Sequence, residues 1–234
     1  RTVGSKLKYE PVLTLGGPII KNKLWFFLKG SFVNDESYEP GYPWDQEDEI
    51  APKLKRFYPY VKLTYSPSQK DKLILSYNFY DSRTDHRRAS QYYKEETTQK
   101  QTNATHTFNV RWTHLFGDSF YANVKLALVE RDFLIHAKKD SAMFTDAYTG
   151  LSQGGYWRHV DDNGRDRRQA NIDVTAFVDN FMGSHELKFG AEYQMFDSYW
   201  LVEGFADPIS GATYNQMIGD DYYLGLKLIG TMNR

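Results

Sequence analysis

The feature that most constrains this chain is an alternation of apolar and polar residues with a period of two, which recurs along the sequence. Successive side chains of a β-strand point to opposite faces of a sheet, so this alternation predicts strands with one apolar and one polar face. Nine segments are expected to form such strands: 12–15, 24–28, 60–65, 72–80, 105–115, 120–131, 170–179, 186–196 and 222–229. No helical periodicity competes with this pattern.

The segments that connect the expected strands alternate between short and long. The short connections are 16–23, 66–71, 116–119 and 180–184, and the long polar ones are about 34–56, 81–104, 132–167 and 197–221. This order predicts an up-and-down meander with all tight turns at one end, which is typical of bacterial outer-membrane barrels. Within the first turn, Gly16-Gly17-Pro18 is expected to break the strand ladder, because glycine allows positive φ and proline lacks an N–H.

Charged residues lie in the middle of the expected strands, all on the polar face. They are Lys29, Lys62, Arg111, Lys125, Asp173, Glu186, Lys188 and Glu192. In a small packed barrel each unpaired charge would cost several kcal/mol, whereas in a wide, wet lumen the cost is small. The pattern therefore favours an all-β fold, an antiparallel up-and-down transmembrane β-barrel, over a soluble β protein.

Composition narrows the possible functions. The 234 residues carry a formal net charge of −1, which gives no global field for a nucleic-acid partner. The chain has no cysteine, so disulfides and cysteine-based metal sites are excluded. Aromatic residues make up 16% although the mean hydropathy is only −0.64, as expected for alternating strands joined by polar loops. No apolar run approaches the ~20 residues that a transmembrane helix needs.

The stretch Leu15–Phe27, LGGPIIKNKLWFF, resembles a recurring hairpin of TonB-dependent outer-membrane transporters. The resemblance is to the Oar-like branch, whose members carry an N-terminal carboxypeptidase-regulatory-like domain. Tyr65–Leu73 and Ser184–Tyr193 also look like this family's barrel, although such hairpins are generic for outer-membrane proteins. The resemblance implies that residues 1–234 are part of one barrel domain of about 22 strands, of which about nine are present. The plug domain, the TonB box and the remaining strands are not recognised in the sequence.

The resemblance implies a multi-pass protein of the Gram-negative outer membrane that takes up a scarce nutrient such as a siderophore, a saccharide or a peptide. Its expected partners are outer-membrane lipid and lipopolysaccharide, the TonB complex acting through the absent plug, and a surface lipoprotein or other protein at the external loops. No cofactor and no enzymatic activity are expected. Two alternatives remain open: a structural barrel that holds partner proteins through its loops, and a soluble secreted β protein that binds carbohydrate.

Candidate ligand-binding residues lie in two of the long polar connections. The segment 34–52 contains seven acidic residues and no lysine or arginine, together with Tyr42, Trp44 and Asp45, and could contact a cationic or sugar-like ligand. In the third long connection, Tyr156, Trp157 and Arg158 form the kind of cluster that is common in contact surfaces. An ordinary packed loop is the alternative interpretation for this cluster.

Catalytic and metal motifs are weak throughout the sequence. The run Asp161-Asp162-Asn163-Gly164-Arg165-Asp166 resembles half of a calcium loop, with Asp161, Asn163 and Asp166 as candidate ligands. Position twelve of such a loop should be a bidentate glutamate but is Ile172, so an ordinary loop tip is the favoured interpretation and no metal is expected. His185-Glu186 lacks the second histidine of a zinc protease motif, and no nucleophile motif occurs.

Overall fold

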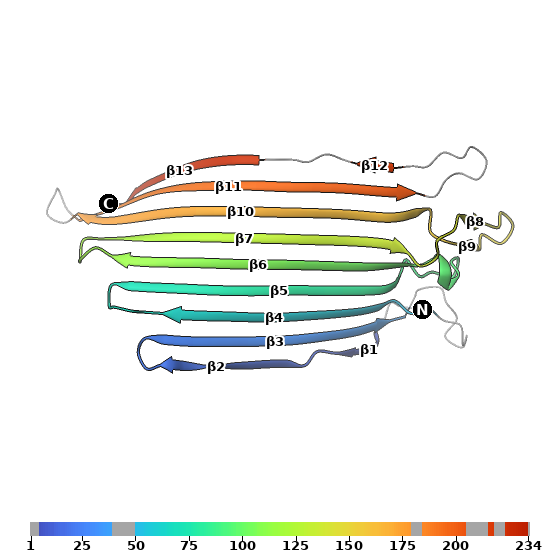
Figure 1. Ribbon diagram of the computed structural model, residues 1–234, viewed down its shortest axis with the longest axis horizontal. Coiled ribbons are helices and arrows are strands. Elements are labelled where there is room, and N and C mark those ends of the chain that lie inside the picture. Colours follow the sequence, from blue (N-terminus) through green and yellow to red (C-terminus); the bar gives the residue numbers. More distant parts are fainter. Residues whose placement is uncertain (1–4, 39–49, 179–183, 205–214, 218–222, 234) are drawn as a thin grey trace.

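The computed structural model describes residues 5–38, 50–178, 184–204, 215–217 and 223–233, and almost all of them form one antiparallel sheet (Figure 1). The strands are β1 Ser5–Tyr9, β2 Val12–Ile20, β3 Leu24–Ser37, β4 Lys53–Tyr65, β5 Asp71–Arg87, β6 Gln99–Leu115, β7 Phe120–Ala137, β10 Arg158–Val178, β11 His185–Gly204, β12 Asn215–Met217 and β13 Tyr223–Asn233. A separate hairpin pairs β8 Met143–Thr145 with β9 Ser152–Gly154. The one helical turn in the described part is η1, Glu95–Thr97.

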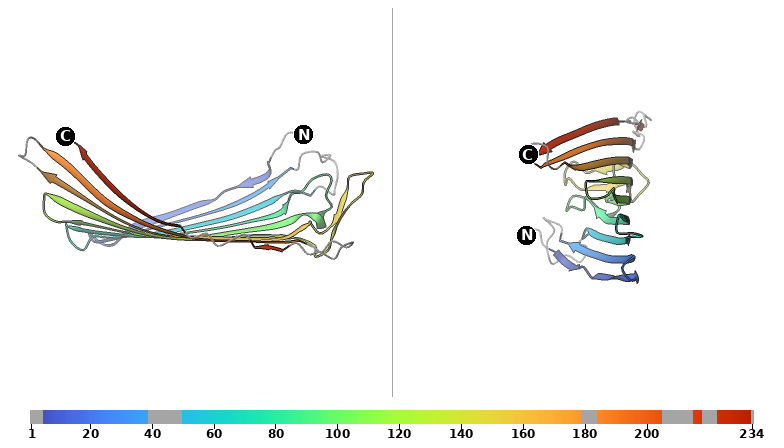
Figure 2. Two further views of the ribbon diagram at one scale, coloured as in Figure 1. Left: turned by 90° about the horizontal axis from the view of Figure 1, so that it is seen from above. Right: turned by 90° about the vertical axis from the view of Figure 1, so that its left-hand side faces the viewer.

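The strand order is the order of the chain, as an up-and-down meander requires. From β3 to β11 each strand pairs with the next long strand, while β1 and β2 both pair with β3, and β12 and β13 both pair with β11. Figure 1 shows the described tight turns at one end of the strands and the long connections at the other. The sheet is twisted and curved, with its ends bent to the same side (Figure 2). The predicted fold class, part of an up-and-down barrel wall, is confirmed.

The nine expected strands are all present, but several are longer than predicted. β10 begins at Arg158 and not near residue 170, and β11 continues to Gly204. The residues added to β10 from Asp161 to Gln169 are polar on both faces, and β10 pairs with β11 continuously from Asp161 to Val178. Period-two alternation marks only strand segments with one apolar face, so strand that is polar on both faces gives no such signal. The long connections are correspondingly shorter than expected.

The prediction that Gly16-Gly17-Pro18 breaks the ladder is wrong for these three residues, although the register does shift directly after them, between Pro18 and Ile20. These residues continue β2 and pair with Phe27, Phe26 and Trp25, and the turn itself lies at 21–23, where Asn22 has φ of 61°. This stretch of β2 pairs only with β3 in the described part, so Pro18 lies on an edge strand, where a proline is tolerated. A Cβ at Gly16 would lie 3.2 Å from the Phe27 ring, so the glycine makes room for that ring.

One face of the sheet is apolar and is left uncovered by the other residues that the structure describes. Leu15 is 58% exposed and Phe189 is 59% exposed, although both lie within long strands. The same face carries Leu13, Leu28, Phe57, Val61, Tyr65, Tyr77, Phe108, Trp112, Leu126, Leu128, Ile172 and Tyr193. A large exposed apolar surface indicates a partner surface or lipid. Within the described residues, no helix has the length and apolar character needed to cross a membrane.

Candidate functional site

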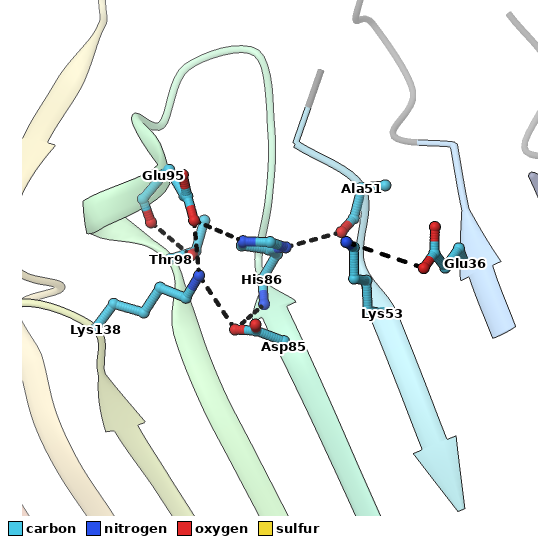
Figure 3. Close-up of polar contacts among 8 residues, drawn as sticks. All are labelled: Glu36, Ala51, Lys53, Asp85, His86, Glu95, Thr98 and Lys138. Atoms are coloured by element: carbon cyan, nitrogen blue, oxygen red, sulfur yellow. Dashed lines mark hydrogen bonds and ion pairs between the residues drawn. The ribbon is translucent and has the colours of Figure 1, made fainter. Parts of the chain in front are cut away.

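The long-connection end of the sheet is organised around a group of interlocked side chains, which we call the loop-end cluster: Asp85, His86, Glu95, Glu96, Lys138 and Lys139. They come from β5, η1 and the chain that follows β7, and Figure 3 shows four of them, Asp85, His86, Glu95 and Lys138. The last residue of η1 and the two residues after it are buried: Thr97 and Thr98 are 0% exposed and Gln99 is 1% exposed. The Thr98 hydroxyl donates to the Glu95 carbonyl oxygen over 2.6 Å, which fixes the end of the helical turn.

His86 joins three connections of the chain at one point. Its Nε2 lies 2.9 Å from Glu95 Oε1, and its Nδ1 lies 3.0 Å from the carbonyl oxygen of Ala51, so it links β5 to η1 and to the segment before β4. Both ring nitrogens therefore face oxygen acceptors, and both contacts are hydrogen bonds in the imidazolium form. The backbone at His86 has φ of 54°, an uncommon conformation for this residue type that directs the chain into the loop.

Lys138 completes the charge balance of the loop-end cluster. Its side chain is only 14% exposed, and its Nζ lies 3.0 Å from Glu95 Oε1 and 3.2 Å from Asp85 Oδ1. The hydrogen bonds from His86 and from Lys138 hold the pKa of Glu95 below its ordinary value. Glu95 and Asp85 therefore share Lys138 as a counter-charge within the cluster.

The neighbouring Glu96 ties η1 to the hairpin of β8 and β9. Its carboxylate accepts from Lys139 Nζ over 2.9 Å and from the Gly154 backbone N–H over 2.8 Å. These two bonds, with that from Lys139 the stronger cause, lower the pKa of Glu96. The backbone of Ser152 also bonds to Tyr92 and Lys94, so the hairpin and the β5–β6 connection form one packed unit.

The predicted contact residues of the third long connection lie in this unit but in different environments. Tyr156 is only 4% exposed: its hydroxyl accepts a hydrogen bond from Arg88, whose guanidinium also lies 4.9 Å from the ring centroid. Trp157 is 46% exposed, and the Arg158 guanidinium lies 5.1 Å from its ring centroid. Tyr156 therefore packs the loops together, whereas a ligand contact by Trp157 and Arg158 stays a prediction. Tyr42, Trp44 and Asp45 lie outside the described residues.

Both interpretations of the run Asp161–Asp166, the favoured ordinary loop tip and the half calcium loop, are wrong as local structure. Asp161, Asn163 and Asp166 lie within the continuous strand β10, where Asp166 points to the opposite face from the other two. The Asp161 carboxylate accepts from Arg158 Nη1 over 2.8 Å and from Trp200 Nε1 over 2.7 Å, so it binds protein donors. Among the residues that the structure describes, no group of three or more metal-ligating side chains comes together.

The polar face of the sheet holds a second feature that the sequence did not reveal, a hollow of about 820 Å³ on β3 and β4. Its walls include Phe27, Tyr58 and Tyr60, with Lys29 and Arg56 between them. The rings of Tyr58 and Tyr80 are tilted by 38° with their centroids 4.9 Å apart, and Phe27 lies edge-on to Tyr60 at 6.1 Å. The sequence analysis predicted only Lys29 of these five residues on the polar face, and the pairing register brings all five to one place.

On the other half of the polar face, charged side chains pair with one another. Lys125 Nζ lies 2.6 Å from Asp173 Oδ2, and Lys188 Nζ lies 3.0 Å from Glu186 Oε1. Glu192 accepts from the amides of Gln169, Asn171 and Gln194. Lys125, Lys188 and Glu192 of this half therefore have partners within the sheet, whereas Lys29 and Arg56 in the hollow on β3 and β4 have no carboxylate partner among the described residues.

Comparison with known proteins adds one informative likeness. No protein-family model and no curated protein matches the chain. Among solved structures, it is similar to the outer membrane transporter YddB from Escherichia coli, with a TM-score of 0.68 and 15% sequence identity. The likeness covers 95% of this chain and 30% of that one, so this chain spans about a third of the length of the transporter it matches. The fold is therefore that of part of an outer-membrane transporter barrel.

Proposed function

We propose that this chain forms part of the wall of an outer-membrane transporter that takes up a scarce nutrient across the outer membrane of a Gram-negative bacterium. The observation that carries the proposal is the pairing of an uncovered apolar face with a charged polar face on one up-and-down sheet. The apolar face would contact lipid and lipopolysaccharide, and the polar face would line the lumen. The likeness to YddB supports the same role at the level of the fold.

The finer parts of the proposal go beyond the fold. We propose uptake driven by the TonB complex, which would act through a plug domain encoded elsewhere in the protein, with a siderophore, saccharide or peptide as the substrate. The proposed assignment to the Oar-like branch rests only on the resemblance of Leu15–Phe27 to that branch. The proposed role is binding and passage of a ligand, with no catalytic step and no cofactor.

The first experiment asks where the full-length protein resides and whether it is a barrel. It should fractionate with the outer membrane and migrate faster in detergent gels before heating than after it, since intact barrels resist unfolding by detergent. A freely soluble protein without a heat shift would contradict the proposal and favour a secreted carbohydrate-binding β protein. Uptake of candidate nutrients with and without a functional TonB complex then tests the energy source.

A structural barrel that holds partner proteins is the second candidate function. It is favoured by exposed aromatic side chains on the packed loops, where Tyr148 is 98% exposed, Phe144 is 57% exposed and Tyr92 is 53% exposed. Exposed aromatic residues on a rigid support are common in protein interfaces. Loss of a co-purifying surface lipoprotein on Tyr148→Ser and Phe144→Ser substitution, with normal nutrient uptake, would favour this function over transport.

A further inference from the structure

We propose that the polar face binds and guides an acidic saccharide, which defines the substrate class of the transporter proposed above and rests on that proposal. The inference comes from the sign of the charge on this face, from hollows that follow one another along it, and from aromatic rings that lie between its cations. We call these cations the cationic path: Lys29, Arg56, Lys62, Arg111, Lys72, Lys70, Lys23 and Lys21.

The sign of charge differs between the polar face and the whole chain. The chain is nearly neutral, with a formal net charge of −1. The strand register places on the polar face the basic residues Lys8, Lys29, Arg56, Lys62, Lys72, Arg111, Lys125, Arg131, Arg165, Arg167 and Lys188. The acidic residues on the same face are Asp35, Asp161, Asp173, Glu186 and Glu192. Basic side chains clearly outnumber acidic ones, so the face attracts anions.

Three hollows lie in succession along this face, from the loop half of the strands to the tight-turn end. The first, on β3 and β4, is lined by three cations and two carboxylates: Lys8, Lys29, Arg56, Glu10 and Asp35. The second shares Tyr60 with the first and contains Lys62 and Arg111. The third, of about 810 Å³, lies between the turns that join β2 to β3 and β4 to β5. It is lined by four lysines and one carboxylate: Lys21, Lys23, Lys70, Lys72 and Asp71. Cations of the path therefore occur in every hollow.

Within the described residues, the cations of the path lack acidic partners. In the segments 5–38, 50–178 and 184–204, no carboxylate lies within 4.0 Å of any nitrogen of these side chains, whereas Lys8, Lys125 and Lys188 do have such partners. Arg56 lies beside the Tyr58 hydroxyl, but its Nε is buried and has no hydrogen-bond partner. A buried donor without a partner is unfavourable, so a ligand that supplies an acceptor there gains affinity.

The first hollow also offers flat aromatic surfaces beside the cations. Phe27, Tyr58 and Tyr60 line it, and the Lys62 ammonium lies 5.5 Å from the Phe27 centroid. Aromatic faces pack against the apolar faces of sugar rings, while tyrosine hydroxyls and the Asn78 amide can bond sugar hydroxyls. Guanidinium and ammonium groups bind carboxylate or sulfate by charge-assisted hydrogen bonds. An acidic saccharide satisfies both requirements in one molecule.

The alternative occupant is an acidic segment of the same protein that lies outside the 234 residues. Such a segment would neutralise the cations but would leave the spaced aromatic rings without a specific role. Repeated hollows along one face suit an extended ligand with regularly spaced charges, as an acidic oligosaccharide has. The charge and the aromatic spacing together therefore favour the saccharide.

The test is binding by the purified full-length protein in detergent, measured by calorimetry with tetragalacturonate and a sulfated heparin tetrasaccharide as acidic probes. Maltotetraose serves as the neutral probe. At least one acidic probe should bind more tightly than maltotetraose, and its affinity should fall as salt is raised. The double variant Arg56→Gln/Lys29→Gln should bind it at least about tenfold more weakly, because two charge-assisted contacts are lost.

The matched control is Lys55→Gln, which removes the same charge from the next residue of β4 on the opposite face of the sheet. It should leave the affinity unchanged. Failure of both acidic probes, equal binding of maltotetraose, or equal weakening by Lys55→Gln would each overturn the inference. Protection of a Lys29→Cys thiol from soluble reagents would also overturn it and assign the hollow to an internal segment. None of these outcomes affects the outer-membrane location or the heat shift, so the broader proposal is judged separately.

Discussion

The loop-end cluster and the cationic path are both rich in charge, but they are built in opposite ways. In the cluster, Glu95 has two partners and Lys138 joins it to Asp85. Along the path, Arg56 and Lys62 have no carboxylate partner within the part of the chain that the structure describes. Charges that satisfy one another stabilise a shape, whereas charges without partners remain available to a ligand. The contrast separates residues that hold the loops together from residues whose charges have no counter-charge among the described residues.

The largest effect is expected from Gly155→Ala, which should disrupt the packing of the loops around the loop-end cluster. A Cβ at Gly155 would lie 2.1 Å from the Lys139 carbonyl oxygen and 2.4 Å from that of Ser141, and both are backbone atoms. The loop must therefore shift, at a cost of about 2 kcal/mol or more in local stability. Hydrogen exchange of residues 138–157 should become faster. Gly30→Ala is the control, because nothing lies within 4 Å of a Cβ at Gly30.

A smaller loss is expected from Lys138→Met, which leaves Glu95 and Asp85 without their shared cation. Because Glu95 is 63% exposed, solvent screens part of the loss, and the local stability should fall by about 1 kcal/mol. The measurement is hydrogen exchange of residues 94–99. Lys139→Met serves for comparison, since it breaks a more exposed pair and should have a weaker effect. Equal effects of both variants would mean that burial of Lys138 adds nothing.

Acid should loosen the loop-end cluster before it affects the strands. The pKa values of Glu95 and Glu96 are depressed in the folded protein, so their contribution is present above the ordinary carboxylate value of 4.5. It is lost as pH falls through the lower folded pKa. His86, Lys138 and Asp85 surround Glu95, and Lys139 faces Glu96. The rate of protease cleavage between residues 88 and 98 should rise below pH 4.5. The double variant Glu95→Gln/Glu96→Gln should no longer show this rise with acid pH.

The smallest effect on stability is expected for Lys62→Gln in the cationic path. Lys62 loses no carboxylate partner on substitution, only the contact of its ammonium with the Phe27 ring at 5.5 Å. The stability of the barrel should therefore change by less than about 0.5 kcal/mol, as for most surface substitutions. The same substitution at Lys125, which loses the pair with Asp173, should cost more. A larger loss at Lys62 would show that another part of the protein covers the path.

Much of the fold could be predicted from local pattern. The alternation of Phe108, Val110 and Trp112 with polar neighbours identified β6, and the lengths of the connections gave the meander. The pattern failed where both faces are polar, as at Asp161–Asp166, since no apolar position marks the strand there. It also failed at Pro18, because the sequence does not tell an edge position from a central one.

The candidate site was less accessible from the sequence. The cluster Tyr156-Trp157-Arg158 was visible, but only the structure separates the buried Tyr156 from the exposed Trp157. His86 gave no signal, because its partners Ala51 and Glu95 come from other connections and meet it only after the strands pair. The first hollow joins residues of β1, β3, β4 and β5 in the same way.

By itself, the sequence determined that the chain pairs into strands with one apolar face and one charged face, because alternation is a local property of the backbone geometry. The tertiary structure decided which charges are neutralised. Lys125 meets Asp173 from a strand 48 residues away, while Lys62 and Arg56 meet no carboxylate of the described residues. Pairing register sets these distances, and a shift of one residue would move every side chain of a strand to the other face.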